Sequence, residues 1–149
     1  MKTLTSVTAI FLVSLFTSPA TAGPATEALS TCLADSTTGK DRKELAQWIF
    51  VAMAAHPDIK PLSAVSAATR EELDKNFARL ATKLLTDSCS KQAKLAIASE
   101  GNASFEASFN VLGKLAMQEL TSNPSVSASF SNYTKYLDRS KIDTIFSTK

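Results

Sequence analysis

The spacing of the apolar side chains is the feature that most constrains this chain. Beyond residue 24 they recur every three or four positions through most of the sequence, a spacing that places them on one face of an α-helix. The 149 residues include only 4 Gly and 5 Pro, and most of these lie where helices would begin or end. The sequence therefore predicts an all-α fold, a compact bundle of five to seven helices.

The expected helices cover about 25–35, 40–55, 69–86, 90–99 and 103–121. Thr38 with Asp41, and Thr69 with Glu72, have the spacing of capping boxes that open the second and third helices. Gly101 is a typical residue to end the fourth. The fifth carries one apolar face and one polar row, so we expect it to pack on one side only; the polar row is Glu106, Asn110, Lys114 and Gln118.

The C-terminal segment is open to two interpretations. Residues 125–131 alternate with period two, as an edge strand would. Val126, Phe130, Tyr133 and Leu137 also fit one face of a helix, which we favour because Asn123-Pro124 resembles a helix cap followed by a first-turn proline. A last short helix with Ile142, Ile145 and Phe146 would then close the bundle.

The first 22 residues resemble a signal peptide. Lys2 supplies a positive start, residues 4–16 are apolar and uncharged, and Pro19-Ala20-Thr21-Ala22 ends in the small residues that signal peptidase requires. A retained membrane anchor is the alternative, but the apolar run is shorter than the roughly 20 residues that span a bilayer. We expect cleavage after Ala22, a single helical domain over 23–149, and a periplasmic or secreted protein with no membrane attachment.

Two cysteines, Cys32 and Cys89, remain in the mature chain. An oxidising compartment favours a disulfide between them. A redox pair or a zinc site is the alternative, although Cys-x-x-Cys is absent and only His56 could join the two sulfurs as a further soft ligand. Without Lys2 the mature chain has a net charge of +1, from 15 basic and 14 acidic residues, which gives no basis for nucleic-acid binding.

The helix over 40–55 is apolar nearly all round. Leu45, Trp48, Ile49, Ala52, Met53 and His56 form the expected stripe, yet Phe50 and Val51 lie off it. Such a helix is either the central helix of the core or part of a partner surface. We favour the central position and take Trp48, Phe50 and Val51 as the candidate partner surface.

No catalytic, cofactor or metal site is predicted. Residues 36–41, Ser-Thr-Thr-Gly-Lys-Asp, resemble the end of a phosphate-binding loop, but the first glycine of that motif is missing and no strand precedes it. His56, the only histidine, lies at a predicted helix end, where its ring could donate to free carbonyls. No orienting carboxylate and nucleophile accompany it in the local sequence.

The segment CLADSTTGKDRKELAQWIFVAMAAHP, residues 32–57, resembles the opening signature of a set of small exported bacterial helical proteins with no assigned activity. More loosely, an exported helical domain with one disulfide is similar to the periplasmic immunity proteins that neutralise type VI secreted amidases. That second resemblance implies a class, a protein inhibitor that is often dimeric, and no binding residue.

Three functional hypotheses follow. The first is a non-enzymatic periplasmic protein that binds another protein or itself, as an inhibitor, an immunity factor or a homodimer. The second is a carrier for a small apolar ligand, which would enclose a cavity between helices. The third is a hydrolase whose nucleophile and base come from distant segments.

Overall fold

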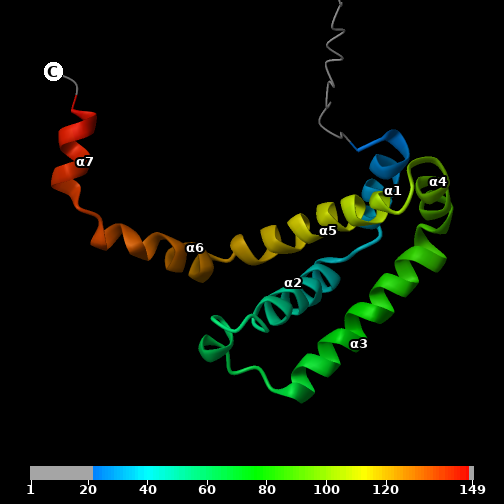
Figure 1. Ribbon diagram of the computed structural model, residues 1–149, viewed down its shortest axis with the longest axis horizontal. Helices are drawn as coiled ribbons and strands as arrows, with labels where there is room; N and C mark the ends of the chain where they lie inside the picture. The colour runs from blue at the N-terminus through cyan, green and yellow to red at the C-terminus, as the bar shows by residue number, and fades with distance from the viewer. Residues whose placement is uncertain (1–21, 148–149) are drawn as a thin grey trace, which may run out of the picture.

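The structure is a computed structural model that describes residues 22–147, and the predicted leader lies outside them apart from its last residue. The described chain is all helical and contains no strand, so the expected all-α fold is confirmed (Figure 1). Seven α-helices follow in order: α1 Pro24–Asp35, α2 Gly39–Met53, α3 Ala67–Lys83, α4 Ser90–Glu100, α5 Ala103–Thr121, α6 Pro124–Ser131 and α7 Arg139–Phe146. Three shorter helical segments join them: η1 Lys60–Leu62, the π-helical segment η2 Leu84–Ser88 and η3 Asn132–Tyr136.

The central helix is α5, which lies against α1, α2 and α4. Small side chains allow this close approach: Ser104 and Ser108 are buried, and Ser108 Oγ donates to the Thr26 carbonyl of α1 at 3.1 Å. On the side of α2, a Cβ placed at Gly113 would lie 3.8 Å from the Ile49 side chain. The prediction that the helix over 40–55 is central was therefore wrong, because small residues pack as closely as large apolar ones and let α5 take that place. The prediction that α5 packs on one side is confirmed, since its polar row is exposed.

Helices α2, α3 and α5 form an open arrangement. Lys43 reaches Glu119 at 3.7 Å and Ile49 lies beside Gly113, so α2 and α5 run in opposite directions. On its other side α2 packs against α3. In contrast α3 and α5, both fully described, have no pair of Cα atoms within 8 Å. A space bounded by three helices therefore remains between α3 and α5.

One predicted helix start is confirmed by the structure and another is wrong. Thr38 and Asp41 form the predicted capping box: each side chain accepts a hydrogen bond from the backbone N–H of the other residue. At α3 the cap is Ser66, whose Oγ accepts from the Thr69 N–H at 3.0 Å, so the predicted start at Thr69 was wrong. Ser66 offers the same hydroxyl acceptor one turn earlier, and a longer helix satisfies more backbone groups.

Cys32 and Cys89 form the predicted disulfide, with an S–S distance of 2.04 Å. Cys32 lies on α1, and Cys89 is a fully buried residue between η2 and α4. The bond thus joins the first helix to the junction between α3 and α4. Gly101 ends α4 with a φ of 76°, a left-handed conformation that favours glycine.

The chain from α6 to α7, residues 124–146, extends away from the other helices as a C-terminal arm (Figure 1). Residues 124–131 are helical, as favoured. Within the described residues, neither η3 nor α7 packs on α1 to α5, and α6 touches only the end of α5. The prediction that the last helix closes the bundle was wrong. The sequence shows that this helix has an apolar face, but not in which direction the junction after α5 sends the chain.

Candidate binding groove

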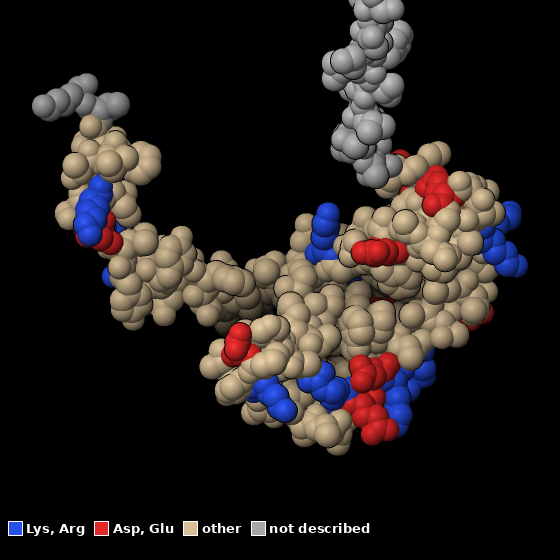
Figure 2. Space-filling model, viewed as in Figure 1, with Lys and Arg blue, Asp and Glu red and all other residues tan. Residues whose placement is uncertain are grey.

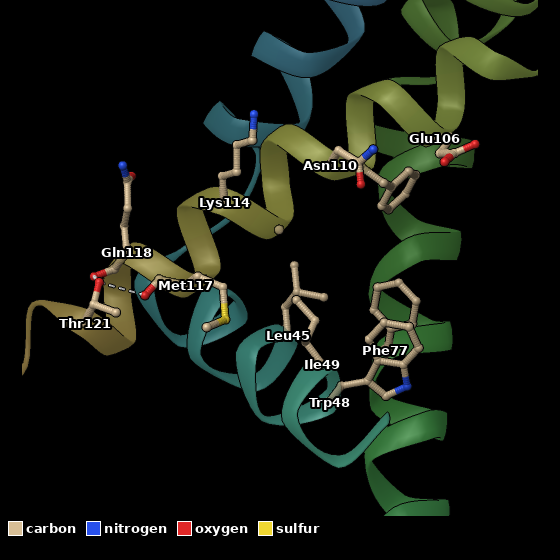
Figure 3. A pocket seen from close by; sticks show the side chains of 12 residues that line it. Leu45, Trp48, Ile49, Phe77, Glu106, Asn110, Lys114, Met117, Gln118 and Thr121 are labelled. Carbon is tan, nitrogen blue, oxygen red and sulfur yellow. Dashed lines mark hydrogen bonds between the residues drawn. The ribbon is translucent and has the colours of Figure 1, made fainter. Parts of the chain in front are cut away.

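A groove of about 880 Å³ lies between α3 and α5, with α2 as its floor. In Figure 3 the Leu45, Ile49 and Met117 side chains point into this space, while Lys114 and Gln118 of α5 point away from it. The apolar lining residues are Leu45, Trp48, Ile49, Phe77, Phe109 and Met117. Three helices that surround an apolar space offer a place for a fourth helical segment.

Three aromatic rings connect the walls of the groove. Trp48 stacks on Phe77 with ring centroids 4.0 Å apart, and Phe77 meets Phe109 edge to face at 6.4 Å. The Trp48 indole Nε1 donates to Asp74 Oδ1 at 2.9 Å, which satisfies its one polar group. Because the rings are fixed by one another and by this hydrogen bond, the apolar wall is formed before anything binds.

The rim of the groove is polar on the side of α5. Glu106, Asn110 and Lys114 lie along it at intervals of four residues, followed by Gln118 and Thr121. We expected this row to be the solvent face of the helix, and Glu106, Asn110, Lys114 and Gln118 are indeed exposed. An apolar floor with a polar edge can bind a segment that is apolar on one face and polar on the other.

The structure places Trp48 apart from the other two residues of the predicted partner surface. Trp48 lines the groove, whereas Phe50, which is 52 % exposed, lines a different hollow on the side of Leu73. Val51 lines the same hollow as Phe50 but is only 5 % exposed. A partner surface formed by these three residues stays a prediction.

The polar contacts of the His56 ring are with the loop that follows α2. The ring is exposed and its Nδ1 accepts a hydrogen bond from the Asp58 N–H at 3.3 Å, with Asp58 Oδ2 at 3.8 Å. In residues 22–147 no serine, threonine or cysteine side chain is hydrogen-bonded to this ring. The predicted bond to the end of α2 does not form either, because the ring turns toward the following loop. The same part of the chain holds no cluster of three side chains that could bind a metal ion.

The carboxyl groups with shifted pKa values all lie at helix starts. Hydrogen bonds from Thr38 lower the pKa of Asp41, and those from Ser140 and Lys141 lower the pKa of Asp138. The Thr26 hydroxyl and the first N–H groups of α1 lower the pKa of Glu100. Each shift has a capping interaction as its cause, so none marks a general acid or base in the groove.

The groove was not foreseen from the sequence. Its floor was assigned to the core and its rim to solvent, because periodicity assigns residues to faces without showing which faces remain uncovered. Gly113, the one glycine within α5, was the available signal for a close approach of another element. No helix of the described residues is long and apolar enough to cross a membrane. Comparison with protein-family models, curated proteins and solved structures finds no match.

Proposed function

We propose that this protein is a non-enzymatic binding protein whose groove holds an amphipathic helical segment of a polypeptide. The observation that carries the proposal is the preformed apolar floor between α3 and α5, whose backbones stay apart while the Phe77 and Phe109 rings meet, with a polar row along one edge. Recognition of an amphipathic helix by such a groove is a recurrent mode of peptide binding. A hydrolase has less support, because the His56 contact found among the described residues is with Asp58, away from the groove.

The compartment and the class of partner belong to the same proposal. The signal-like sequence and the disulfide favour an exported protein, because such bonds persist in oxidising compartments. In that compartment, a helical domain that covers a segment of another protein would act as an inhibitor or an immunity factor. This finer assignment rests on architecture and compartment alone.

A carrier for a small apolar ligand is the second candidate, favoured by the groove's volume. About 880 Å³ falls within the range of pockets that bind small molecules. Such sites usually cover most of the ligand surface. Here Met117 is 37 % exposed and the rim residues Asn110, Lys114 and Gln118 are exposed as well. The groove is therefore open along α5, which suits a helix better than an enclosed ligand.

Site-specific photocrosslinking tests the proposal. A photoreactive phenylalanine analogue is placed at Met117 inside the groove or at Val111, which is on the same helix, is equally exposed at 38 %, and does not line the groove. In cells that export the protein, we expect a crosslinked polypeptide from position 117 and at least tenfold less from position 111. Mass spectrometry of the adduct identifies its class.

The possible outcomes separate the two candidates. A polypeptide adduct specific to position 117 supports the proposed function. Equal yields at both positions, or no polypeptide at all, contradict it. A lipid-sized adduct at position 117 alone would favour the carrier and overturn protein binding.

A further inference from the structure

We propose that the groove is filled by the C-terminal arm of a second copy of this chain, so that two molecules exchange arms reciprocally. The inference rests on the proposed function, since it names the occupant of the same groove. Both partners of the contact are then present in one sequence: an apolar groove without a fourth helix, and a helical arm without a surface to pack on.

The arm carries an apolar stripe at helical spacing. Val126, Phe130, Tyr133 and Leu137 follow one another at intervals of four, three and four residues, the spacing of one face of an α-helix. In the structure α6 and η3 carry the first three of them, and Leu137 follows η3 in an extended conformation. Phe130 is 66 % exposed and Tyr133 63 % exposed. Figure 2 shows the arm mostly uncharged, with charged side chains gathered near α7, whereas the body carries many. The stripe is therefore an apolar face of the kind that could cover the apolar floor of the groove.

The lengths of the two partners agree. Along α5 the groove extends from Glu106 to Thr121, which is roughly 22 Å at the helical rise of 1.5 Å per residue. The helical part of the arm, α6 followed directly by η3, covers residues 124–136 and is also roughly 22 Å long. One arm segment would fill the groove from end to end.

The junction between α5 and α6 favours a second copy over the arm's own body. Asn123 is extended and caps α6 by accepting from the Ser125 N–H at 2.9 Å, and Pro124 fixes the next φ. A residue before proline is disfavoured in the helical region. The Ser122 and Asn123 N–H groups donate to the Gln118 and Leu120 carbonyls at 2.9 and 3.1 Å. The junction is thus held in the outward direction, and a short constrained hinge favours exchange between copies over closure within one.

The apolar area is that of a small specific interface. The exposed stripe residues Phe130, Tyr133 and Leu137 leave on the order of 300 Å² of apolar side chain on each arm. Two arms in two grooves would bury on the order of 1,000 Å² in total, about the least that a specific interface requires. A single arm closing on its own body would leave no such surface for a second copy.

The first test compares two tyrosines of the arm. Tyr133 lies on the stripe and Tyr136 lies off it, although Tyr136 is the more exposed at 84 %. By light scattering across a range of concentrations we expect a dimer for the unmodified protein and for Tyr136→Asp. Tyr133→Asp should raise the dimer dissociation constant at least tenfold. Equal effects of the two substitutions would overturn the proposal, as would an unmodified protein that remains monomeric.

The second test restores one contact from two defective chains. Met117→Glu places a charge in the groove and leaves the arm unchanged. Tyr133→Asp places a charge on the apolar stripe of the arm and leaves the groove unchanged. Each variant alone should be monomeric, while their mixture should form a one-to-one heterodimer, detected by native mass spectrometry. Val111→Glu serves as the control for Met117→Glu and should remain a dimer. Absence of the heterodimer would overturn the exchange.

Failure of this inference can be told apart from failure of the proposed function. If the adduct at position 117 contains a different polypeptide and the protein is monomeric, the groove binds a helix of another protein and the arm exchange is wrong. If no polypeptide is crosslinked, both the arm exchange and the proposed function are wrong. Monomers whose Trp48 fluorescence changes with Tyr133→Asp would show closure within one chain and would likewise overturn the exchange.

Discussion

Glu100 holds the start of α1 although it lies 75 residues further along the chain than Ala25. The cap position of α1 is Gly23, which has no side chain to satisfy the first N–H groups. The Glu100 carboxylate accepts from the Ala25 and Thr26 N–H groups at 2.9 and 3.0 Å, and also from the Thr26 hydroxyl. A carboxylate from α4 thus takes the place of a local cap and fastens α1 to α4.

This cap makes the free energy of unfolding depend on pH. Because the folded state lowers the pKa of Glu100, its contribution is complete above the ordinary pKa of a glutamate and is lost as the pH falls through the lower folded-state value. We expect Glu100→Gln to lower the urea midpoint near about pH 7, and the difference from the unmodified protein to shrink toward about pH 3. Glu27→Gln, which removes the same charge from the first turn of α1, should have little effect. A difference that is constant with pH would contradict the role of this carboxylate.

At the scale of helices, α5 depends on its small residues. Ser108 is fully buried and its hydroxyl reaches the Thr26 carbonyl, so α1 approaches α5 more closely than leucine-sized side chains would allow. Ala116, eight residues further along the same row of α5, is also fully buried, and Gly113 lies beside the Ile49 side chain. The positions of short side chains on α5 therefore determine where α1 and α2 can pack closely against it.

We expect enlargement at this contact to be costly. Ser108→Leu should lower the free energy of unfolding by about 1–3 kcal/mol, because a close-packed contact must open to admit it. Ala98→Leu makes a similar enlargement at an exposed position of α4 and should change stability by less than about 0.5 kcal/mol. Urea unfolding of both variants, followed by circular dichroism, makes the comparison. Similar stabilities would show that α1 and α5 have room to separate.

The helices themselves could be predicted, whereas their arrangement could not. Thr38, Gly101 and Asn123-Pro124 mark boundaries through local chemistry, and the structure confirms each of them. The cap at Ser66 was missed because Thr69 offered an equally good local pattern. The groove and the arm were missed because a periodic pattern shows that a face is apolar, but not whether another part of the same chain covers it.

For the whole molecule, the disulfide is the one covalent restraint between distant segments. It joins residues 57 apart in sequence and connects α1 to the junction of α3 and α4. It lies in the part of the fold that contains the buried leucines of α1 and α5, far from the end of α5 where the arm begins (Figure 1). Body and arm are therefore stabilised by different means.

Reduction should destabilise the body and spare the helicity of the arm. The chain-entropy model gives about 4 kcal/mol for a loop of this size. We expect a non-thiol reductant to lower the thermal midpoint of the unmodified protein, and the variant with Cys32→Ser and Cys89→Ser to be equally destabilised but insensitive to reductant. An unmodified protein whose midpoint is unchanged on full reduction would show that packing alone fixes α1.

If the leader is cleaved after Ala22, as the proposed export requires, the closeness of Gly23 to Glu100 has a consequence for maturation. A Cβ built on Gly23 would overlap the Glu100 carboxylate, so the backbone there runs directly beside it. A chain released from its leader after Ala22 would begin with an ammonium group at that spot, at the positive end of the α1 dipole, where a cation alone is unfavourable. The carboxylate would supply the counter-charge. Removal of the leader would then add an ion pair to the folded protein, and processing and folding would reinforce each other.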